Sequence, residues 1–186
     1  MSDFFVHGTS CVDDNVMIGK GTKIWHFSHI QSGARIGEDC VMGQNVNVSN
    51  DVTIGDRCKL QNNVSVYEGV TLEDDVFCGP SMVFTNDLRP RAFIKDTSKY
   101  GKTVLRKGCS VGANATIVCG HEVGRYAMVA AGAVVTKNVK AHALVAGVPA
   151  KQLGWVCTCG AMLDESLTCP ECNKAYVETE MGLEQK

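Results

Sequence analysis

Four cysteines near the C-terminus have the residue type and spacing of metal ligands. They form two close pairs in the segment WVCTCGAMLDESLTCPECNKAY: Cys157 and Cys159, then Cys169 and Cys172. Gly160 permits a tight turn after the first pair and Pro170 stiffens the second, and four thiolates form a closed tetrahedral site for structural Zn²⁺. C-P-E-C is a strong zinc signal, whereas C-T-C-G is one residue shorter than the usual C-x-x-C. We therefore expect a small zinc-ribbon-like appendage at 155–177 and a tail at 178–186. A degenerate ribbon without metal, or one with other ligands, is the alternative.

A basic segment in the middle of the chain is the second candidate. Residues 85–108 read TNDLRPRAFIKDTSKYGKTVLRKG and carry seven of the 18 basic residues of the chain. These are Arg89, Arg91, Lys95, Lys99, Lys102, Arg106 and Lys107, against Asp87 and Asp96. An irregular loop of this length in a compact domain is usually functional or disordered. Its charge predicts an anionic partner such as phosphates, and a solvated surface loop is the alternative.

A repeat of six residues must position both candidates. Aliphatic residues recur at every sixth position from Val6 to Phe84, and a mostly small residue follows each of them four places later. This period fits neither a helix nor an isolated strand, and it predicts a solenoid in which each hexad supplies one short strand and one corner of a coil. The beat resumes at Val111. The sequence therefore predicts an all-β parallel β-helix over residues 1–151, interrupted by an insertion at 85–108.

With three hexads in each coil, residues 18 apart stack and create two contrasting faces. The hexads of one face lack charge and carry aromatic and amide side chains: 24–29, 42–47, 60–65 and 78–83. The hexads of the other face are crowded with charge: 36–41, 54–59 and 72–77. Interface cores are depleted in charge and enriched in aromatic residues. We therefore expect the uncharged face, which bears Trp25, Phe27, Asn45 and Asn63, to pack against other subunits. Stacked amides also form hydrogen-bonded ladders, and both interpretations can hold together.

Length and composition narrow the class of protein. A net charge of −2 over 186 residues gives no general case for nucleic-acid binding. No apolar run of about 18 residues and no signal-peptide pattern is present, so we expect a cytoplasmic protein without a membrane partner. The other six cysteines are expected to remain reduced and to fill the repeats as small apolar residues. They are Cys11, Cys40, Cys58, Cys78, Cys109 and Cys119.

The hexads IGKGTK, IGEDCV, IGDRCK and VGANAT, with AAGAVVTKNV and GVPAK after them, resemble those of the left-handed β-helix acyltransferases. The resemblance covers about residues 1–151. It implies a left-handed β-helix, a homotrimer, and acetyl-CoA bound in grooves between neighbouring coils with active sites shared across subunits.

Finer features are most similar to a narrower group. The strings TKIWHFSHIQSGARIG, VYEGVTLEDDVFCGPSMVFTND and TNDLRPR, and the Cys-rich tail after GVPAKQLGWVC, resemble bacterial N-acetyltransferases of O-antigen synthesis. Those enzymes modify the 3-amino group of a UDP-linked 2-acetamido-3-amino-uronic acid. Related enzymes act on dTDP-3-amino-deoxyhexoses, which remains the alternative substrate class.

The reaction implied here is acyl transfer to an amine. It needs a nucleophile, a donor for the developing oxyanion and an acceptor for the proton. A partly neutral sugar amine attacks without a strong base, so a catalytic histidine is optional. In the resembling enzymes an Asn beside the insertion holds the amine, and the departing thiolate can take the proton. Asn86 matches that Asn, although Asn-Asp is also common turn chemistry.

Other candidate substrate ligands surround this position. Glu68 lies 18 residues before Asn86, one coil earlier, and is expected to orient the amine or to bond a sugar hydroxyl. Tyr67 precedes it on the same face. Otherwise Glu68 is a solvated turn carboxylate. Arg89 and Arg91 of the insertion are expected to bind the charged groups of the nucleotide sugar.

The histidines are weaker candidates. His26 and His29 project from the uncharged face and are candidate substrate ligands across a subunit boundary, although interface histidines more often pack and hydrogen-bond. His121 lies in phase with Ala115 and Ala127, which favours a buried structural role over that of a base.

For the cosubstrate, the resemblance implies small residues along the pantetheine arm. Ala131 and Gly132 leave backbone amides accessible to it, and Lys137 and Lys151 are expected to meet the CoA phosphates. Small residues are also expected in any β-helix because its coils pack closely.

A function of a different class, a non-catalytic scaffold subunit, needs neither the basic insertion nor the stacking of Glu68 over Asn86. An O-acetyltransferase would need an activated histidine, and none is clearly placed for that role.

Overall fold

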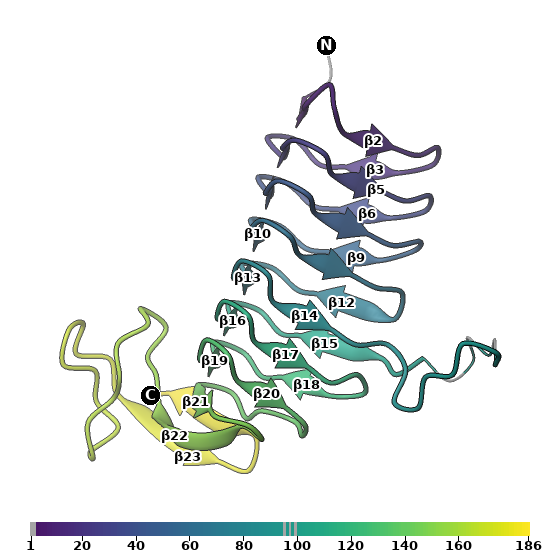
Figure 1. Ribbon diagram of the computed structural model, residues 1–186. Coiled ribbons are helices and arrows are strands. Elements are labelled where there is room, and N and C mark those ends of the chain that lie inside the picture. Colours follow the sequence, from purple (N-terminus) through teal and green to yellow (C-terminus); the bar gives the residue numbers. More distant parts are fainter. Residues whose placement is uncertain (1–2, 95, 97, 99) are drawn as a thin grey trace.

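The computed structural model describes residues 3–94, 96, 98 and 100–186 and shows a parallel β-helix with an appendage (Figure 1). The described residues form strands, corners and loops, and none of them is in an α-helix. The coils stack from the N-terminus at the top of the view. The insertion projects to one side from the fifth coil, between β14 and β15, and the Cys-rich appendage lies beside the last coils.

Three sheets form the walls of the β-helix. The first sheet contains β1 (Phe5–Val6), β4 (Lys23–Ile24), β7 (Val41–Met42), β10 (Lys59–Leu60), β13 (Phe77–Cys78), β16 (Ser110–Val111), β19 (Met128–Val129), β21 (Ala143–Ala146) and the antiparallel β22 (Lys151–Trp155). The second contains β2 (Cys11–Val12), β5 (His29–Ile30), β8 (Asn47–Val48), β11 (Ser65–Val66), β14 (Val83–Phe84), β17 (Thr116–Ile117) and β20 (Val134–Val135). The third contains β3 (Met17–Ile18), β6 (Arg35–Ile36), β9 (Thr53–Ile54), β12 (Val70–Leu72), β15 (Thr103–Leu105) and β18 (Glu122–Val123).

Strand pairing confirms the predicted stacking of residues 18 apart. Cys11 pairs with His29 and Met17 with Arg35, both in parallel register. The offset rises to 33 where Val70 pairs with Thr103, and it falls to 16 where Met128 pairs with Leu144. The chain has therefore returned to the coil at β15, and the expected end of the insertion at residue 108 is wrong. The insertion corresponds to the segment before Thr103.

The aliphatic residues of the six-residue repeat fill the interior, as expected. Ile24, Ile30 and Met42 have no exposed surface, and the apolar core is continuous from there to Val145. Beat residues of the first coil are only partly buried, because no coil covers them on one side. The prediction that Cys11 fills the core is wrong. Val12 takes the inward position, so alternation along the strand turns Cys11 outward, where it is exposed.

The three corners of the coil differ in composition. The uncharged corner joins the first sheet to the second and contains residues 25–28, 43–46, 61–64 and 79–82. The insertion corner joins the second sheet to the third and contains residues 49–52, 67–69, 85–102 and 118–121. The charged corner joins the third sheet to the first and contains residues 37–40, 55–58, 73–76 and 106–109. Each corner therefore forms a continuous column down the β-helix. The side chains of one stack of turns all lie on the same side of the molecule.

Aligned side chains stabilise these columns. In the uncharged corner Asn45 Nδ2 donates to Asn63 Oδ1 at 3.0 Å, which is the amide ladder expected from the sequence. Phe27 stands at the same turn position with a φ of 59° and is 60% exposed. In the charged corner Arg57 Nε donates to Asp75 Oδ1 at 2.7 Å. The pKa of Asp75 is lowered, first because of this hydrogen bond.

The appendage begins at β22 and ends in a hairpin of β23 (Tyr176–Thr179) and β24 (Gly182–Gln185). The domain boundary expected after residue 177 falls inside β23, so residues 178–186 form part of the appendage rather than a separate tail. Leu183 packs in the same small core as Cys157. The hairpin also docks on the last coil, where Ala141 N–H donates to Met181 O at 3.0 Å and Leu183 N–H donates to Ala141 O at 3.2 Å. Gly182 is required there because a Cβ would collide with Ala141.

Candidate active site

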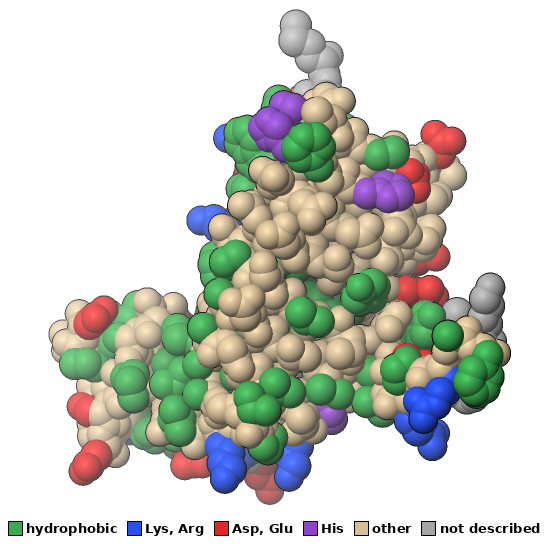
Figure 2. Space-filling view, viewed as in Figure 1, with side chains coloured by type: hydrophobic (Ala, Val, Ile, Leu, Met, Phe, Trp, Pro, Cys, Tyr) green, Lys and Arg blue, Asp and Glu red, His purple; other side chains and the backbone are tan. Residues whose placement is uncertain are grey.

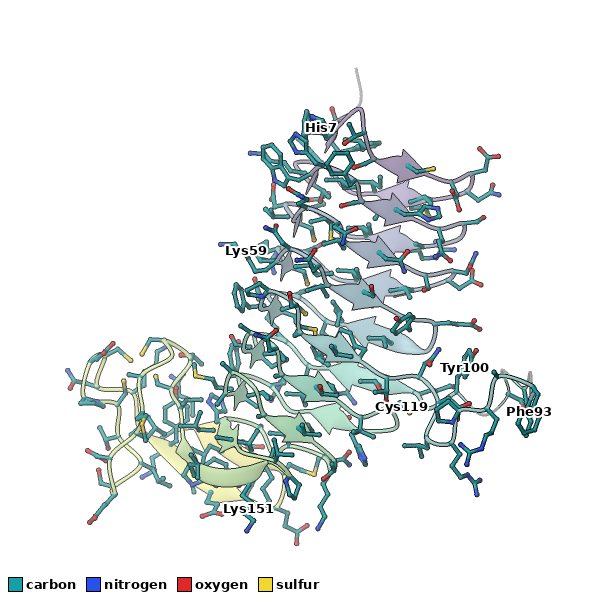
Figure 3. All side chains as sticks on the ribbon, in the orientation of Figure 1. His7, Lys59, Phe93, Tyr100, Cys119 and Lys151 are labelled. Carbon is teal, nitrogen blue, oxygen red and sulfur yellow. The ribbon has the colours of Figure 1, made fainter. Side chains whose placement is uncertain are left out.

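The insertion leaves and rejoins the β-helix at neighbouring points. Asn86 follows β14, and its carbonyl accepts a hydrogen bond from Gly101 N–H at 3.1 Å. Thr103 N–H then donates to Gly69 O at 3.0 Å, which restores the coil. One turn further, Cys119 N–H donates to Thr85 Oγ1 at 3.0 Å. Figure 3 shows Cys119 and Tyr100 close to this junction and Phe93 at the outer end of the insertion. Asn86 is therefore held by a rigid backbone frame at the root of a projecting loop.

The structure brings Tyr67 and Glu68 to the same root. They occupy the insertion corner one coil before Asn86, where Ser65 pairs with Val83. A Cβ placed on Gly69 would lie 3.3 Å from Gly101 O, so this corner contacts the end of the insertion directly. Tyr67 is 38% exposed, Glu68 is exposed and Asn86 is half-buried. Neither the Glu68 nor the Asn86 side chain hydrogen-bonds to another described residue, so both can bind a ligand.

The insertion presents both charge and apolar surface. Arg89 and Arg91 are exposed, and their described hydrogen bonds are local: Arg89 N–H donates to Asp87 Oδ1 and Arg91 Nη1 to Pro90 O. Phe93 is 84% exposed at its tip. Figure 2 shows basic side chains gathered on the insertion and at the last coils. Lys95 and Lys99 lie outside the described residues.

Arg106 and Lys107 do not belong to this basic surface, in contrast to the sequence prediction. Arg106 Nη1 donates to Glu73 Oε1 at 2.8 Å and its Nη2 to Glu122 Oε2 at 2.6 Å, so it crosslinks three successive coils. Lys107 N–H donates to Glu73 Oε2 at 2.9 Å. Burial raises the pKa of Glu73, but the bonds from Arg106 and Lys107 outweigh it and lower the pKa overall. The Lys107 Nζ lies 3.9 Å from Asp74 Oδ2 and 3.9 Å from Asp75 Oδ2. Both basic residues therefore stabilise the coil.

His26 and His29 lie away from this root within one chain. His26 stacks on His7 with ring centroids 3.5 Å apart, and His29 Nε2 lies 3.0 Å from Asp13 Oδ1. Both residues stand on the second coil, three coils from Asn86, which corresponds to about 14 Å at about 4.8 Å per strand. The pKa of Asp13 is lowered, first because of its hydrogen bond with His29.

His121 is half-buried rather than buried, so the sequence prediction for it is wrong. It is on the insertion corner one coil beyond the root, and its carbonyl accepts from Val104 N–H at 3.3 Å. Its neighbours in phase, Ala115 and Ala127, are buried. Sequence phase alone did not predict this partial exposure.

The candidate cosubstrate residues lie on the coils beyond the insertion. Ala131 and Gly132 are exposed on the uncharged corner, and a Cβ added to Gly132 would meet no other atom within 4 Å. Lys137 is exposed and lines a cavity of about 220 Å³ together with Gln152, the residue after Lys151. The two lysines therefore stand at the same end of the β-helix, marked by Lys151 in Figure 3.

The four tail cysteines converge as the spacing predicts. Their sulfur atoms all lie within 4.8 Å of one another, with Cys157 and Cys172 3.4 Å apart and Cys159 and Cys169 3.6 Å apart. A tetrahedral Zn²⁺ with bonds of about 2.3 Å separates its sulfur ligands by about 3.8 Å, so these residues fit the ion. Burial raises the pKa of Cys157, but hydrogen bonds from the Cys159 backbone and the Tyr176 hydroxyl lower it to about 6. The thiolate form of Cys157 is thereby favoured. A hydrogen bond from the Lys174 backbone lowers the pKa of Cys172, but burial and the neighbouring cysteine thiols outweigh it and raise that pKa to about 12.

Comparison with known proteins identifies the family. The family described as bacterial transferase hexapeptide (six repeats) matches residues 15–50, and hexapeptide repeat of succinyl-transferase matches 33–68 and 107–137. A dTDP-3-amino-3,6-dideoxy-alpha-D-galactopyranose 3-N-acetyltransferase from Aneurinibacillus thermoaerophilus is 42% identical over 92% of this chain and 90% of its own length. The chain belongs to the hexapeptide-repeat acetyltransferases.

Two further relatives of the acetyltransferase agree with this assignment. A hexapeptide-repeat acetyltransferase from Vibrio cholerae, solved in complex with acetyl coenzyme A, superposes with a TM-score of 0.58 at 26% identity, covering 66% of this chain and 70% of that one. The bifunctional protein GlmU of Shouchella clausii is 30% identical over 75% of the acetyltransferase but only 28% of its own length. The predicted class, an acetyl-CoA-dependent acyltransferase, is therefore confirmed, and it is favoured over the alternative of a non-catalytic scaffold subunit. Among the described residues, no helix is long and apolar enough to cross a membrane.

Proposed function

We propose that the acetyltransferase transfers the acetyl group of acetyl-CoA to the 3-amino group of a nucleotide-linked amino sugar. The observation that carries the proposal is the convergence of Asn86, Glu68 and Tyr67 at the root of the basic insertion. The site offers an amide and a carboxylate that have no hydrogen-bond partners among the described residues. These groups suit an amine and neighbouring hydroxyls, and two exposed arginines suit a diphosphate.

The same residues support a mechanism for the chemical step. The amine attacks the thioester carbonyl, the C–N bond forms, and the C–S bond breaks to release CoA. Glu68 and the side-chain amide oxygen of Asn86 accept hydrogen bonds from the amine and orient its lone pair. The amine proton leaves with the CoA thiolate, which becomes a thiol. Positioning of this kind lowers the activation barrier because it holds the amine against the thioester carbonyl in a reactive geometry. A sufficiently basic amine then needs little further activation.

Of the two sugar classes, we favour a dTDP-linked 3-amino-3,6-dideoxyhexose over the UDP-linked 2-acetamido-3-amino-uronate that the sequence motifs favour. The support is the 42% identity to the Aneurinibacillus thermoaerophilus enzyme, which is named for such a substrate. Arg89 and Arg91 are the candidate ligands of the diphosphate in either case.

A second mechanism uses His121 as a general base. It is favoured by one observation, the half-burial of His121 on the insertion corner one coil beyond Asn86. An O-acetyltransferase would need such a base, because a hydroxyl is a poor nucleophile without one. The described residues place no carboxylate in hydrogen-bonding contact with the His121 ring, so the ring lacks the orienting partner that such bases usually have.

We further propose that the enzyme is a homotrimer that binds acetyl-CoA between subunits. The proposed interface is the uncharged corner, which bears Trp25, Phe27, Asn45 and Asn63, together with the adjoining outward side of the second sheet, where Val83 is 46% exposed. Figure 2 shows that charged side chains gather at the edges of this face. A second subunit on this face would bring its His26 or His29 toward substrate. Gly132 and Ala131 then line the pantetheine arm, and Lys137 and Lys151 bind the phosphates of CoA.

The Cys-rich appendage is proposed to hold one structural Zn²⁺ through Cys157, Cys159, Cys169 and Cys172. All four positions are occupied by thiolates, so the ion has no open site for chemistry. Because Leu183 of the hairpin joins the same core and also contacts Ala141, zinc would stabilise the cap over the last coil.

The function is tested by measuring CoA release with a panel of nucleotide sugars. The panel contains the dTDP-linked 3-amino-3,6-dideoxyhexose, the UDP-linked 3-amino-uronate, a 4-amino sugar and the corresponding 3-hydroxy sugars. We expect release with 3-amino sugars, fastest with the dTDP-linked one. Release with hydroxyl acceptors only, together with loss of activity in His121→Asn but not in Asn86→Ala, would establish the O-acetyltransferase instead.

A further inference from the structure

Three potential metal ligands converge on the outside of the first two coils, far from the Cys-rich appendage. Cys11 on β2 and His29 on β5 are directly paired neighbours in the second sheet. Asp13 follows Cys11 by two residues and shares its outward side, since side chains alternate along a strand. A sulfur, a nitrogen and a carboxylate oxygen therefore meet on adjacent strands by register alone.

The distances suit a small cation. The ligand atoms of Cys11, Asp13 and His29 all lie within 4.8 Å of one another. Asp13 Oδ1 is 3.0 Å from His29 Nε2 and 3.7 Å from Cys11 Sγ. In a tetrahedral zinc site with bonds of about 2.0–2.3 Å, neighbouring ligand atoms are separated by about 3.3–3.7 Å. Opening the His29–Asp13 contact by a few tenths of an ångström is enough to admit the ion.

We propose that Cys11, Asp13 and His29 form a second metal site, selective for Zn²⁺ or a similar divalent transition metal. Mixed sulfur, imidazole and carboxylate ligands are typical of zinc. The three ligands come from paired strands and the residue after one of them, so the site is largely preformed. Three protein ligands leave a fourth position for water.

The position of the site indicates its effect. The inward residues of the first coil, including Val6, Val12 and Ile18, are only partly buried, whereas Ile24 and Ile30 of the second coil are completely buried. The first coil is thus the least supported part of the β-helix. A metal that joins Cys11 and Asp13 of the first coil to His29 of the second would clamp this end of the repeat.

The alternative is a metal-free surface pair. His29 and Asp13 form an ion pair when the imidazole is protonated, and the Cys11 thiol can donate to Asp13. This arrangement accounts for two of the contacts, but it assigns no role to the exposed thiol. The two interpretations differ in metal stoichiometry, which is directly measurable.

The test is a zinc titration of the metal-free full-length chain against a chromogenic chelator, with Co²⁺ spectra as a second probe. Wild type should bind one equivalent of zinc more than Cys11→Ser or His29→Gln. Loss of one ligand should weaken zinc binding at this site by more than the roughly 10–100-fold that follows when a hydrogen-bonding partner of a ligand is removed. Cys119→Ser, which removes a buried thiol elsewhere in the coil, is the matched control and should keep the full stoichiometry.

Hydrogen exchange provides the second readout. Zinc should slow exchange in residues 5–18 of wild type but not of Cys11→Ser. Cys169→Ser separates the two sites, because it should lose the appendage metal and retain the N-terminal one. Equal zinc stoichiometry in wild type and Cys11→Ser, or protection of the first coil that is independent of zinc, would overturn the proposal.

Discussion

The carbonyl oxygen of Asn86 accepts a hydrogen bond from the backbone N–H of Gly101 at 3.1 Å, so the two ends of the insertion are tied together. Gly101 in turn touches the corner that carries Glu68, because a Cβ on Gly69 would lie 3.3 Å from Gly101 O. The basic loop is therefore anchored where the two candidate catalytic side chains stand. A change at Asn86 that spares its backbone should leave this anchor intact.

Asn86→Ala should reduce kcat by about 10²-fold with little change in KM for the nucleotide sugar, because one orienting hydrogen bond is lost and the anchoring carbonyl is kept. Steady-state kinetics and circular dichroism check the activity and the fold. Gln185→Ala, which removes an exposed amide on β24 of the appendage, is the control and should keep its kcat. Full activity in Asn86→Ala would refute the proposed role of Asn86.

Arg89→Ala and Arg91→Ala should each raise KM for the nucleotide sugar roughly tenfold while kcat changes little, since a contact to a charged phosphate is lost in ground state and transition state alike. Their described hydrogen bonds are local, so the fold should be unaffected. Lys59→Ala removes an exposed cation from β10 and serves as the control. If KM for the sugar stays unchanged in both arginine variants, the insertion does not bind the diphosphate.

Phe27→Asp should dissociate the proposed trimer into particles with the 20.0 kDa mass of one chain and should lower activity. Phe27 has a φ of 59°, which Asp tolerates better than Phe, so the isolated chain should not be strained. Light scattering after size-exclusion chromatography measures the mass. Asn15→Asp adds the same charge at an exposed turn position with a φ of 62° on the insertion corner of the first coil, away from the uncharged corner, and it should leave the assembly unchanged.

Glu73→Gln should remove part of the acid sensitivity of the fold. The folded pKa of Glu73 lies below its ordinary value of 4.5, so its carboxylate stabilises the native state above that pH, and this stabilisation is lost as the pH falls through the folded pKa. Urea unfolding from neutral pH to below 4.5 should therefore show a smaller decline for the variant. Glu165→Gln, in the exposed part of the appendage, is the control. Identical declines for wild type and Glu73→Gln would contradict the role of the Arg106 crosslink.

Cys169→Ser should lower the zinc content by one equivalent per chain and increase hydrogen exchange over residues 155–177, because the loss of one of four thiolates weakens zinc binding and opens the site. Most transferase activity should remain, since the insertion root belongs to other coils. Elemental analysis measures the metal. Cys78→Ser, at a buried thiol of the β-helix, should retain the zinc. Unchanged zinc content in Cys169→Ser would exclude the tail as its site.

The sequence by itself determined the repeat and therefore the architecture. A period of six is a local property, because each hexad must turn one residue inward and make one corner, and the 18-residue stacking of Cys11 on His29 follows from it. It also placed Glu68 beside Asn86 and grouped the four tail cysteines, since each group depends on spacing within a few coils or a few turns.

Only the tertiary structure decided where the insertion ends and what its flanking charges do. Val70 pairs with Thr103 across a break in the period, so the return point depends on backbone hydrogen bonds between distant strands. Arg106 donates hydrogen bonds to Glu73 and Glu122 on the adjacent coils, and no local sequence pattern predicts these pairings. The partial exposure of His121 has the same origin, because a side chain's burial depends on the coil above it as well as on its own place in the repeat.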